Sequence, residues 1–246
     1  MKVIAYTALL YGSDYLEWAI RSVIDHVDEY WVLYSAKGSH GHSATSACPD
    51  SRDRLYTIAQ RAAGRKLRWH DGVWAIEGDQ RDTIHTLVPD ADAIVVLDAD
   101  EVWGPGLVEM ALAQHSAGFR NLYVPIIHYW RSFRRAAIHD PAYPVRVIFQ
   151  RYSDANYGGV NTNGKVINHM GYAQNEDVTY YKLQTHGHKG EFRRDVDWWR
   201  QRFLNNAQVD CHPVGSDYWN PEDVNPLDTM PAWMKDHPYF NLKVIK

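Results

Sequence analysis

Residues 93–103 read AIVVLDADEVW, an uninterrupted apolar run that passes directly into acidic residues. A run without polar alternation is typical of a central strand whose two faces are both covered. Upstream, predicted strands and helices alternate along the chain: 2–8 (strand), 16–27 (helix), 29–35 (strand), 52–63 (helix), 66–74 (strand) and 79–88 (helix). This order predicts an α/β fold with a mixed, mainly parallel sheet flanked by helices.

Downstream of this stretch the pattern loosens. A helix is predicted at 105–114 and strands at 121–127 and 145–150. Turns, a helix around 191–207 and a proline-rich tail follow. We therefore expect a main domain over residues 1–190 and an irregular C-terminal extension, helical and rich in proline and aromatic residues, over 191–246 that packs on the same domain.

Composition narrows the class of protein. The chain has 246 residues, 45% of them hydrophobic, so it can bury a sizeable core. Its net charge of −4 does not favour binding of nucleic acid by overall electrostatic attraction. The two cysteines, Cys48 and Cys211, cannot form a disulfide framework. No apolar run reaches the roughly 18 residues of a membrane helix, and the start shows no leader pattern. We expect an unprocessed cytoplasmic protein without a membrane span.

The acidic end of the central strand carries the clearest chemical signal. Asp98 and Asp100 follow a buried strand, whereas the same spacing at Asp90 and at Asp195 falls in polar segments. Ligands bind beyond the carboxyl ends of strands in such sheets. Two carboxylates one residue apart can present oxygens to a hard cation that bridges a diphosphate. Residues 71–101 are strongly acidic and residues 117–155 are rich in arginine, which suits a metal ion beside an anionic ligand.

At these motifs the chain resembles the glycosyltransferases of the GT-A fold, in particular the family-two-like branch. The resemblance rests on TALLYGSDYLEWAIRSVIDHVDEYWVLYS (7–35) and GDQRDTIHTLVPDADAIVVLDADEVW (78–103), and more loosely on FQRYSDANYGGV (149–160) and THGHKGEF (185–192). It covers about residues 1–190. The implied activity is transfer of a sugar from a nucleotide-diphosphate donor with the help of Mn²⁺ or Mg²⁺.

The resemblance also implies roles for single residues. Nucleotide-binding positions map to Thr7, Ala8 and Tyr11, with Arg81 beside the nucleotide or the sugar. Asp98 would orient the ribose or a water, and the implied metal set is Asp98, Asp100 and His186. Gly158 and Gly159 match a loop near the donor sugar, where the absence of side chains allows close approach.

The general base is expected in the triplet Asn175-Glu176-Asp177, which matches the family's position for it, with Asp177 as first choice and Glu176 behind it. In the family this triplet opens a helix, but here residues 178–183 resemble a strand, and on a continuing strand His186 and His188 would share a face. The segment after the second strand reads Leu33-Tyr34-Ser35-Ala36 and lacks the acidic residue that usually recognises the base. The nucleotide of the donor is therefore open.

Other functions also fit part of the pattern. Asp98-Ala99-Asp100-Glu101-Val102 matches the motif of haloacid-dehalogenase-like phosphohydrolases, in which Asp98 would be the nucleophile. Nucleotidyl transfer would need a glycine-rich loop after the first strand, and Leu9 to Gly12 is a poor one. A non-catalytic carbohydrate-binding module could use the tryptophans as stacking platforms: Trp198, Trp199, Trp219 and Trp233.

The acceptor is not determined by the sequence. The arginines of residues 131–135 and the aromatic tail could form an acceptor platform, a dimer contact or a lid. Glycans, proteins and small molecules all remain open as acceptors. A modified nucleic acid is disfavoured by the net negative charge.

Overall fold

The computed structural model describes residues 1–152, 156–214 and 219–242. Its larger sheet has seven strands in the order β10-β6-β9-β4-β1-β2-β3. The strands are β1 Val3–Leu9, β2 Glu29–Ser35, β3 Leu67–Gly72, β4 Ala93–Val96, β6 Asn121–Tyr123, β9 Val145–Phe149 and β10 Tyr157–Gly159. The pairs β1–β2, β2–β3, β1–β4 and β6–β10 are parallel, and β9 is antiparallel to both β4 and β6. The predicted mixed, mainly parallel α/β sheet is confirmed.

Strand β1 shows why this sheet lies in the core. Val3, Ala5 and Leu9 point into one apolar cluster and Ile4 and Tyr6 into another, because successive side chains of a strand point to opposite faces. Both faces are thus buried. The chain covers them with helices.

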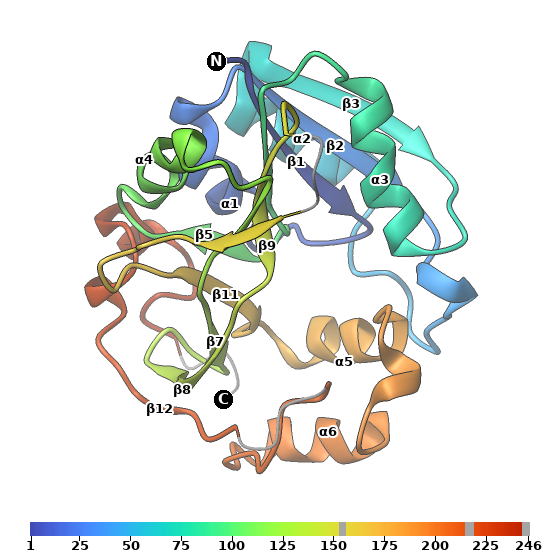
Figure 1. Cartoon of the computed structure of the whole chain (residues 1–246). Helices are drawn as coiled ribbons and strands as arrows, with labels where there is room; N and C mark the ends of the chain where they lie inside the picture. The colour runs from blue at the N-terminus through green and yellow to red at the C-terminus, as the bar shows by residue number, and fades with distance from the viewer. Residues whose placement is uncertain (153–155, 215–218, 243–246) are drawn as a thin grey trace.

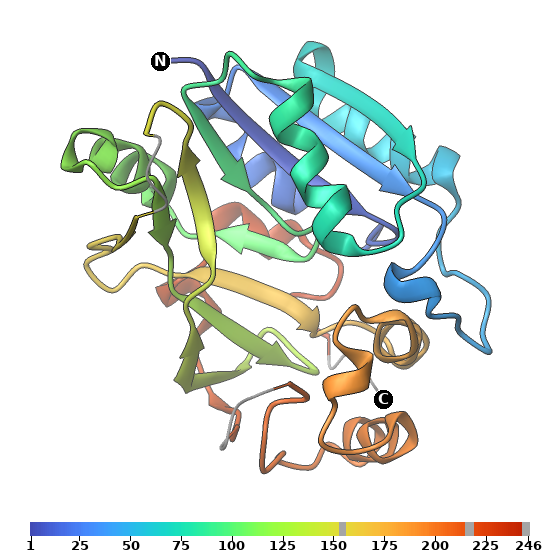
Figure 2. The ribbon, with the colours of Figure 1, turned by 45° about the vertical axis from the view of Figure 1, so that its right-hand side comes forward.

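The helices divide between the two faces of this sheet. Their bounds are α1 Leu16–Val23, α2 Arg52–Ala63, α3 Glu77–Leu87 and α4 Leu107–Leu112. α1, α2 and α4 contribute to one apolar cluster, whereas α3 packs in the other, and Figure 1 and Figure 2 show α3 lying on its own side of β1, β2 and β4. Among the described helices, none is both long and apolar enough to cross a membrane.

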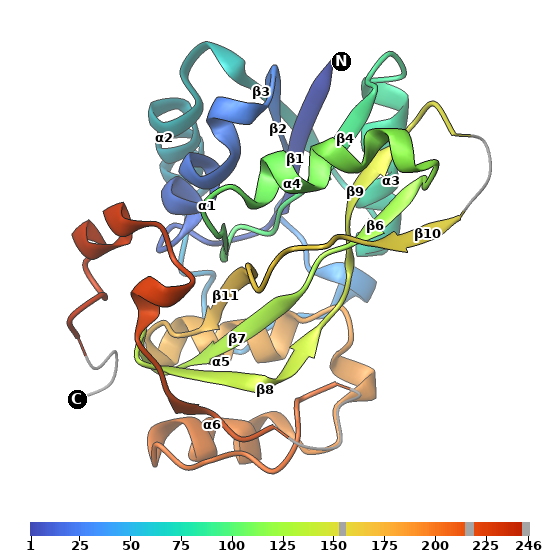
Figure 3. The ribbon, with the colours of Figure 1, turned by 60° about the vertical axis from the view of Figure 1, so that its left-hand side comes forward.

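A second sheet was not predicted as a separate unit. It has five strands in the order β12-β8-β7-β11-β5 and lies beside the first, as Figure 3 shows. Its strands are β5 Glu101–Trp103, β7 Ile126–Trp130, β8 Arg135–Ala142, β11 Ile167–Tyr172 and β12 Glu222–Asp223. The strand predicted at 121–127 is in fact two strands, one in each sheet, because Pro125 has no amide hydrogen to donate to a ladder.

The position of β5 matters for function. β4 ends at Val96 in the first sheet and β5 begins at Glu101 in the second. The acidic turn Asp98-Ala99-Asp100 therefore connects the two sheets. Asp98 and Asp100 line the cavity described below.

Helix α5, Glu176–Thr185, corrects the prediction of a strand at 178–183. The side chain of Asn175 accepts a hydrogen bond from the backbone N–H of Val178 at 2.9 Å and so caps the first turn. Nearly every residue from Val178 to Thr185 is buried, so the segment shows no one-sided apolar stripe from which a helix could be recognised. His186 follows the last helical residue, and the strand face predicted for His186 and His188 does not exist.

The C-terminal extension packs against the second sheet and against α1 and α5. The predicted helix at 191–207 is shorter, α6 Val196–Leu204, and single helical turns form at Lys189–Glu191, Pro226–Asp228 and Ala232–Asp236. β12 pairs with β8, and Trp219 is fully buried against Trp130, with ring centroids 5.5 Å apart.

The buried tryptophans bear on the alternative of a carbohydrate-binding module. Trp199 and Trp219 are 1% and 0% exposed, and Trp233 stacks on Trp18 with ring centroids 5.9 Å apart. A stacking platform needs an exposed ring face. Trp199 and Trp219 therefore form part of the core and cannot serve as platforms.

Candidate active site

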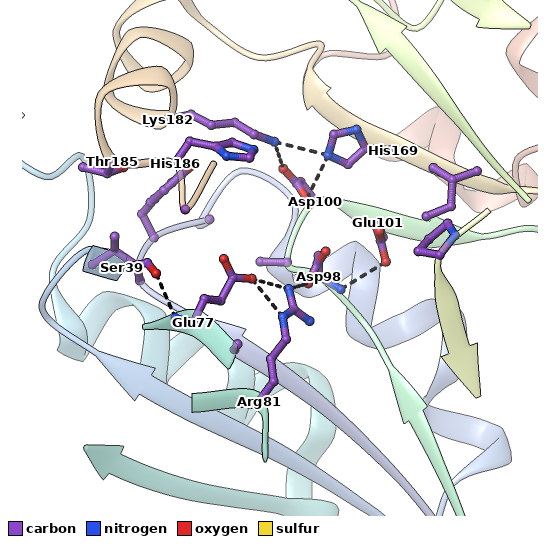
Figure 4. A pocket seen from close by; sticks show the side chains of 18 of the residues that line it. Ser39, Glu77, Arg81, Asp98, Asp100, Glu101, His169, Lys182, Thr185 and His186 are labelled. Atoms are coloured by element: carbon purple, nitrogen blue, oxygen red, sulfur yellow. Dashed lines mark hydrogen bonds and ion pairs between the residues drawn. The ribbon is translucent and has the colours of Figure 1, made fainter. Parts of the chain in front are cut away.

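A cavity of about 550 Å³ opens where the carboxyl ends of β1 and β4 meet the second sheet and α5. Its volume lies within the range of small-molecule sites. Four acidic, four basic and four histidine side chains line it: Glu77, Asp98, Asp100, Glu101, Lys37, Arg81, Arg146, Lys182, His128, His169, His186 and His212. Figure 4 shows many of these side chains pointing toward one another across the cavity. Such a concentration of charge in one hollow marks it as the candidate active site.

Asp98 is held between two arginines. Its Oδ1 accepts a hydrogen bond from Arg81 Nη2 at 2.6 Å and its Oδ2 one from Arg146 Nη2 at 2.9 Å. Burial raises the pKa of Asp98, but the charges of Arg81 and Arg146 outweigh that effect and lower it to about 2. Asp98 is therefore ionised at neutral pH, and both of its oxygens are engaged.

Two further carboxylates complete this network. Glu101, 1% exposed, accepts hydrogen bonds from Arg146 Nε at 3.0 Å and Nη2 at 2.5 Å. Glu77 accepts hydrogen bonds from Arg81 Nε at 2.9 Å and Nη2 at 2.5 Å. Burial raises the pKa of Glu101 even though Arg146 opposes it. Each arginine thus bridges two carboxylates, which fixes both guanidinium groups at the floor of the cavity.

Asp100 has a separate set of partners. Lys182 Nζ, from α5, donates to its Oδ2 at 2.8 Å, and His169 Nε2, from β11, lies 3.5 Å from its Oδ1. Burial raises the pKa of Asp100, but Lys182 and His169 hold it well below its usual range. The Lys182 side chain is 9% exposed, and Asp100 raises the pKa of that amine against the effect of burial. The pair is a buried ion pair.

Gly171 makes room for this pair. A Cβ at this position would lie 2.0 Å from Lys182 Nζ and 2.6 Å from Asp100 Oδ2. Any larger residue would push the two charged groups apart. Gly12, whose φ is +142°, makes room for Ala99, because a Cβ at position 12 would lie 2.7 Å from Cβ of Ala99.

Histidines form the wall of the cavity on the side of the second sheet. The Nδ1 atoms of His128 and His169 are 2.7 Å apart, so one of them carries the shared hydrogen. Burial and the charge of His169 lower the pKa of His128 well below its usual range. Burial, followed by the charge of Lys182, lowers the pKa of His186 to about 3. His128 and His186 are therefore neutral at pH 7.

These pairings bear on the predicted Mn²⁺ or Mg²⁺. Within the described residues, no group of three His, Cys, Asp or Glu side chains is placed to hold a metal ion. Asp98 is neutralised by Arg81 and Arg146, and Asp100 by Lys182. A divalent cation would have to displace these side chains before it reached the carboxylates. The residues as they are placed do not fit the implied metal.

Some of the predicted nucleotide-binding residues line the cavity and others lie behind its lining. Ala8, Tyr11, Arg81 and Asp98 line it. Thr7 lies behind the lining, fully buried, with its hydroxyl hydrogen-bonded to that of Tyr30. The first strand therefore brings its loop to the cavity but not Thr7.

Four other predicted residues do not line the cavity. Gly158 and Gly159 lie on β10 at the edge of the larger sheet, and a Cβ on Gly158 would lie 2.5 Å from the ring of Phe119. Glu176 accepts hydrogen bonds from Arg200, and Asp177 is exposed in the first turn of α5. Their proposed roles have no support from this arrangement.

Sequence reasoning missed several residues that the fold brings to the cavity, chiefly Arg146, His169 and Lys182. Arg146 was visible as one of many arginines in residues 117–155, with no signal to set it apart. Lys182 was hidden in a segment predicted to be a strand. His169 lies 69 residues beyond Asp100 on another sheet, and only its tertiary position reveals it.

The phosphohydrolase alternative needs a free oxygen on Asp98. Both oxygens accept hydrogen bonds from arginines, and the backbone N–H of Asp98 donates to Glu101 at 3.2 Å. A carboxylate held in this way is a poor nucleophile, because its charge is already stabilised. The arrangement of Asp98 disfavours this chemistry.

Several solved structures match the chain distantly. No protein-family model and no curated protein matches the chain. The solved structure of glucosyl-3-phosphoglycerate synthase from Mycobacterium tuberculosis with Mg²⁺ and UDP is 16% identical, has a TM-score of 0.36 and covers 53% of this chain and 44% of that chain. The structure of the first 349 residues of S. aureus TarS is 12% identical, has a TM-score of 0.36 and covers 58% of this chain and 38% of that chain.

A third match is 4-diphosphocytidyl-2C-methyl-D-erythritolsynthase from Anaerococcus prevotii, 12% identical with a TM-score of 0.38, over 74% of this chain and 95% of that chain. The chain is thus only distantly similar to these three solved structures. It spans less than half the length of the mycobacterial synthase. TM-scores below 0.5 are too low to assign a ligand or a reaction, so the function has to follow from the site.

Proposed function

We propose that this protein transfers a sugar from a nucleotide-diphosphate donor to an acceptor. The observation that carries the proposal is the cavity itself, where Asp98 and Asp100 end the central strand among the fixed cations Arg81, Arg146 and Lys182. In a parallel sheet, this edge is where nucleotides bind. The volume of about 550 Å³ suits a ligand of that size.

The reaction would join an acceptor oxygen or nitrogen to the anomeric carbon and break the bond from that carbon to the diphosphate. Negative charge builds on the leaving diphosphate, so cations fixed in advance lower the barrier. Lys182 is the best-placed such cation, because its amine borders the cavity and Asp100 holds it there. Lys37 is a second, since it lines the cavity and no ion pair ties it to any other described residue.

The same lining suggests how the donor is oriented. Four acidic and four basic side chains balance, so the empty cavity carries no large net charge from them. Each oxygen of Asp98 accepts one hydrogen bond from an arginine and keeps a second lone pair, which can accept one from a ribose or sugar hydroxyl group. Tyr11 and Ala8 would contact the nucleotide from the loop after β1.

The first experiment is a thermal-shift panel of UDP, GDP, CDP, TDP and ADP, each with Mn²⁺ and with EDTA. We expect one diphosphate to raise the melting temperature, since a ligand at 100 times its dissociation constant adds about 2.7 kcal/mol. The shift should persist in EDTA, because the carboxylates already have cations of the chain as partners. Stabilisation only with Mn²⁺ would show that the metal displaces Lys182, and stabilisation by none would contradict the proposal.

Two variants test whether the diphosphate binds in this cavity. Lys182→Met should abolish the shift by the chosen diphosphate. Arg65→Gln is the matched control, because Arg65 is exposed just before β3, at the opposite end of the parallel strands from the cavity. The corresponding nucleotide-sugar should then release its diphosphate slowly in the presence of wild-type protein, which a pure binding module would not bring about.

The general base remains a proposal for Asp177, with Glu176 second. Asp177→Asn and Glu176→Gln form a matched pair, because both lie in the first turn of α5. Loss of transfer without loss of donor binding in the first variant alone would support Asp177. Full activity of both variants would assign the base to a residue that lines the cavity, which neither Asp177 nor Glu176 does.

The acceptor is to be found by offering glycans, peptides, small molecules and modified nucleic acids to the donor-bound protein. A cytoplasmic site of action and a homodimer remain part of the proposal. Size-exclusion chromatography with light scattering tests the dimer.

A further inference from the structure

A second cavity, of about 870 Å³, lies away from the candidate active site. The turn that follows β7, the β8–β12 edge and the chain beyond α6 line it, and no residue lines both cavities. Its most basic wall comes from a single short segment that holds Arg131, Arg134 and Arg135. The mechanism proposed above does not use these arginines.

Arg131 is a buried cation with no counter-ion among the described residues. It is 8% exposed, and its Nε is buried without a hydrogen-bond partner. No described carboxylate forms an ion pair with it, and its guanidinium instead lies over the ring of Phe203, 5.7 Å from the centroid. Burial, together with the charge of Arg135, lowers its pKa. A buried charge is ordinarily paired, since leaving it unpaired is costly.

The backbone holds Arg131 in place. Its φ is +61°, a left-handed conformation that residues with a side chain rarely adopt, and its N–H donates to the carbonyl of Tyr172 at 2.6 Å. Strain of this kind at a non-glycine residue is typical of functional positions. The turn therefore holds the guanidinium at the cavity wall despite the cost in conformational energy.

The neighbouring side chains leave room for an anion. Arg135 donates to the side-chain oxygen of Asn206 at 3.1 Å and to the carbonyl of Pro221 at 3.2 Å. Arg134 is exposed, and its guanidinium bonds to no other described residue. Glu222 and Asp223 also line the cavity, but Glu222 pairs with His139 at 2.9 Å and Asp223 is exposed.

We propose that this cavity binds an oxyanion group, a phosphate or a carboxylate, through Arg131 and Arg134. Guanidinium groups bind both anions with two parallel hydrogen bonds. The volume exceeds that of a single phosphate, so the anion would be part of a larger molecule. This site is independent of the sugar-transfer proposal, because its residues and its cavity are separate.

The test is titration calorimetry with inorganic phosphate and, separately, with citrate, against NaCl of equal ionic strength. We expect one of the two to bind wild-type protein. Arg134→Gln should weaken binding roughly tenfold, as expected for the loss of a charged hydrogen bond. Arg131→Gly removes the guanidinium and keeps the turn, since glycine tolerates positive φ.

Controls separate this site from the active site and from general charge. Arg65→Gln, on the surface, should bind the anion as the wild type does. Lys182→Met removes a cation of the first cavity, so anion binding that persists in this variant belongs to the second cavity. Binding of phosphate alone would name phosphate esters as the ligand class, and binding of citrate alone would name carboxylates. Equal affinity of wild type, Arg131→Gly and Arg134→Gln, or no binding of either anion, would overturn the proposal.

Discussion

The buried cations of the two cavities differ in their partners. In the first, Arg81, Arg146 and Lys182 each contact a carboxylate at 2.5 to 2.8 Å. In the second, Arg131 is also buried but lies near another arginine and over an aromatic ring. A paired cation stabilises the fold and fixes the geometry of a site. An unpaired one adds little to the fold, and its compensation has to come from a ligand.

Breaking the first cavity at Arg146 should have the largest effect. Arg146→Met leaves Asp98 and Glu101 without their shared partner, and removal of one member of a buried pair costs about 3–5 kcal/mol. Urea unfolding measures this loss. Arg52→Met is the control, because its pair with Asp71 is exposed and should contribute below about 1 kcal/mol. A loss as small as the control's would show that the network is not a structural element.

Lys182→Met should cost somewhat less, about 3 kcal/mol, because a single carboxylate loses its partner and His169 remains beside it. The double variant Lys182→Met with Asp100→Asn removes both charges. It should recover part of the stability in the same urea experiment. If the double variant is less stable than Lys182→Met, the ion pair is not the reason for the loss.

Lowering the pH should reduce the stability of the first cavity through protonation of His186. Its pKa is lowered to about 3 when folded, so the unfolded chain takes up a proton near pH 6.5 and the folded chain does not. Stability from this group is complete above about pH 6.5 and declines as the pH falls toward 3. His186→Gln should reduce the loss between pH 7 and pH 5 by up to about 2 kcal/mol. Parallel stability curves for wild type and variant would contradict the assignment.

The smallest effect is expected in the second cavity. Arg131→Gly should change the free energy of unfolding by no more than about 1 kcal/mol, because it removes an unpaired charge and relieves a positive φ. Urea unfolding at pH 7 tests this. A loss as large as that of Arg146→Met would mean that Arg131 has a structural role, and the contrast between the cavities would fail.

The sequence by itself determined four parallel strands of the larger sheet and the edge at which the cavity lies. The alternation from Val3 to Val96 predicted the four parallel strands, and the apolar run that ends at Asp98 predicted a site at their carboxyl edge. These are local signals, because periodicity and strand ends depend on neighbouring residues. The pocket around Asp98 and Asp100 was therefore found from a stretch of about ten residues.

Tertiary structure decided the partners of those two carboxylates. Arg146 lies 48 residues from Asp98, and Lys182 lies 82 residues from Asp100. No local pattern links positions so far apart. Helix α5 was mistaken for a strand because it is buried on nearly all sides, and only its packing shows that Lys182 reaches Asp100. The two carboxylates of the expected metal set form ion pairs with basic side chains instead. The sequence could not show this, because the groups that compensate a charge are brought together only in the folded chain.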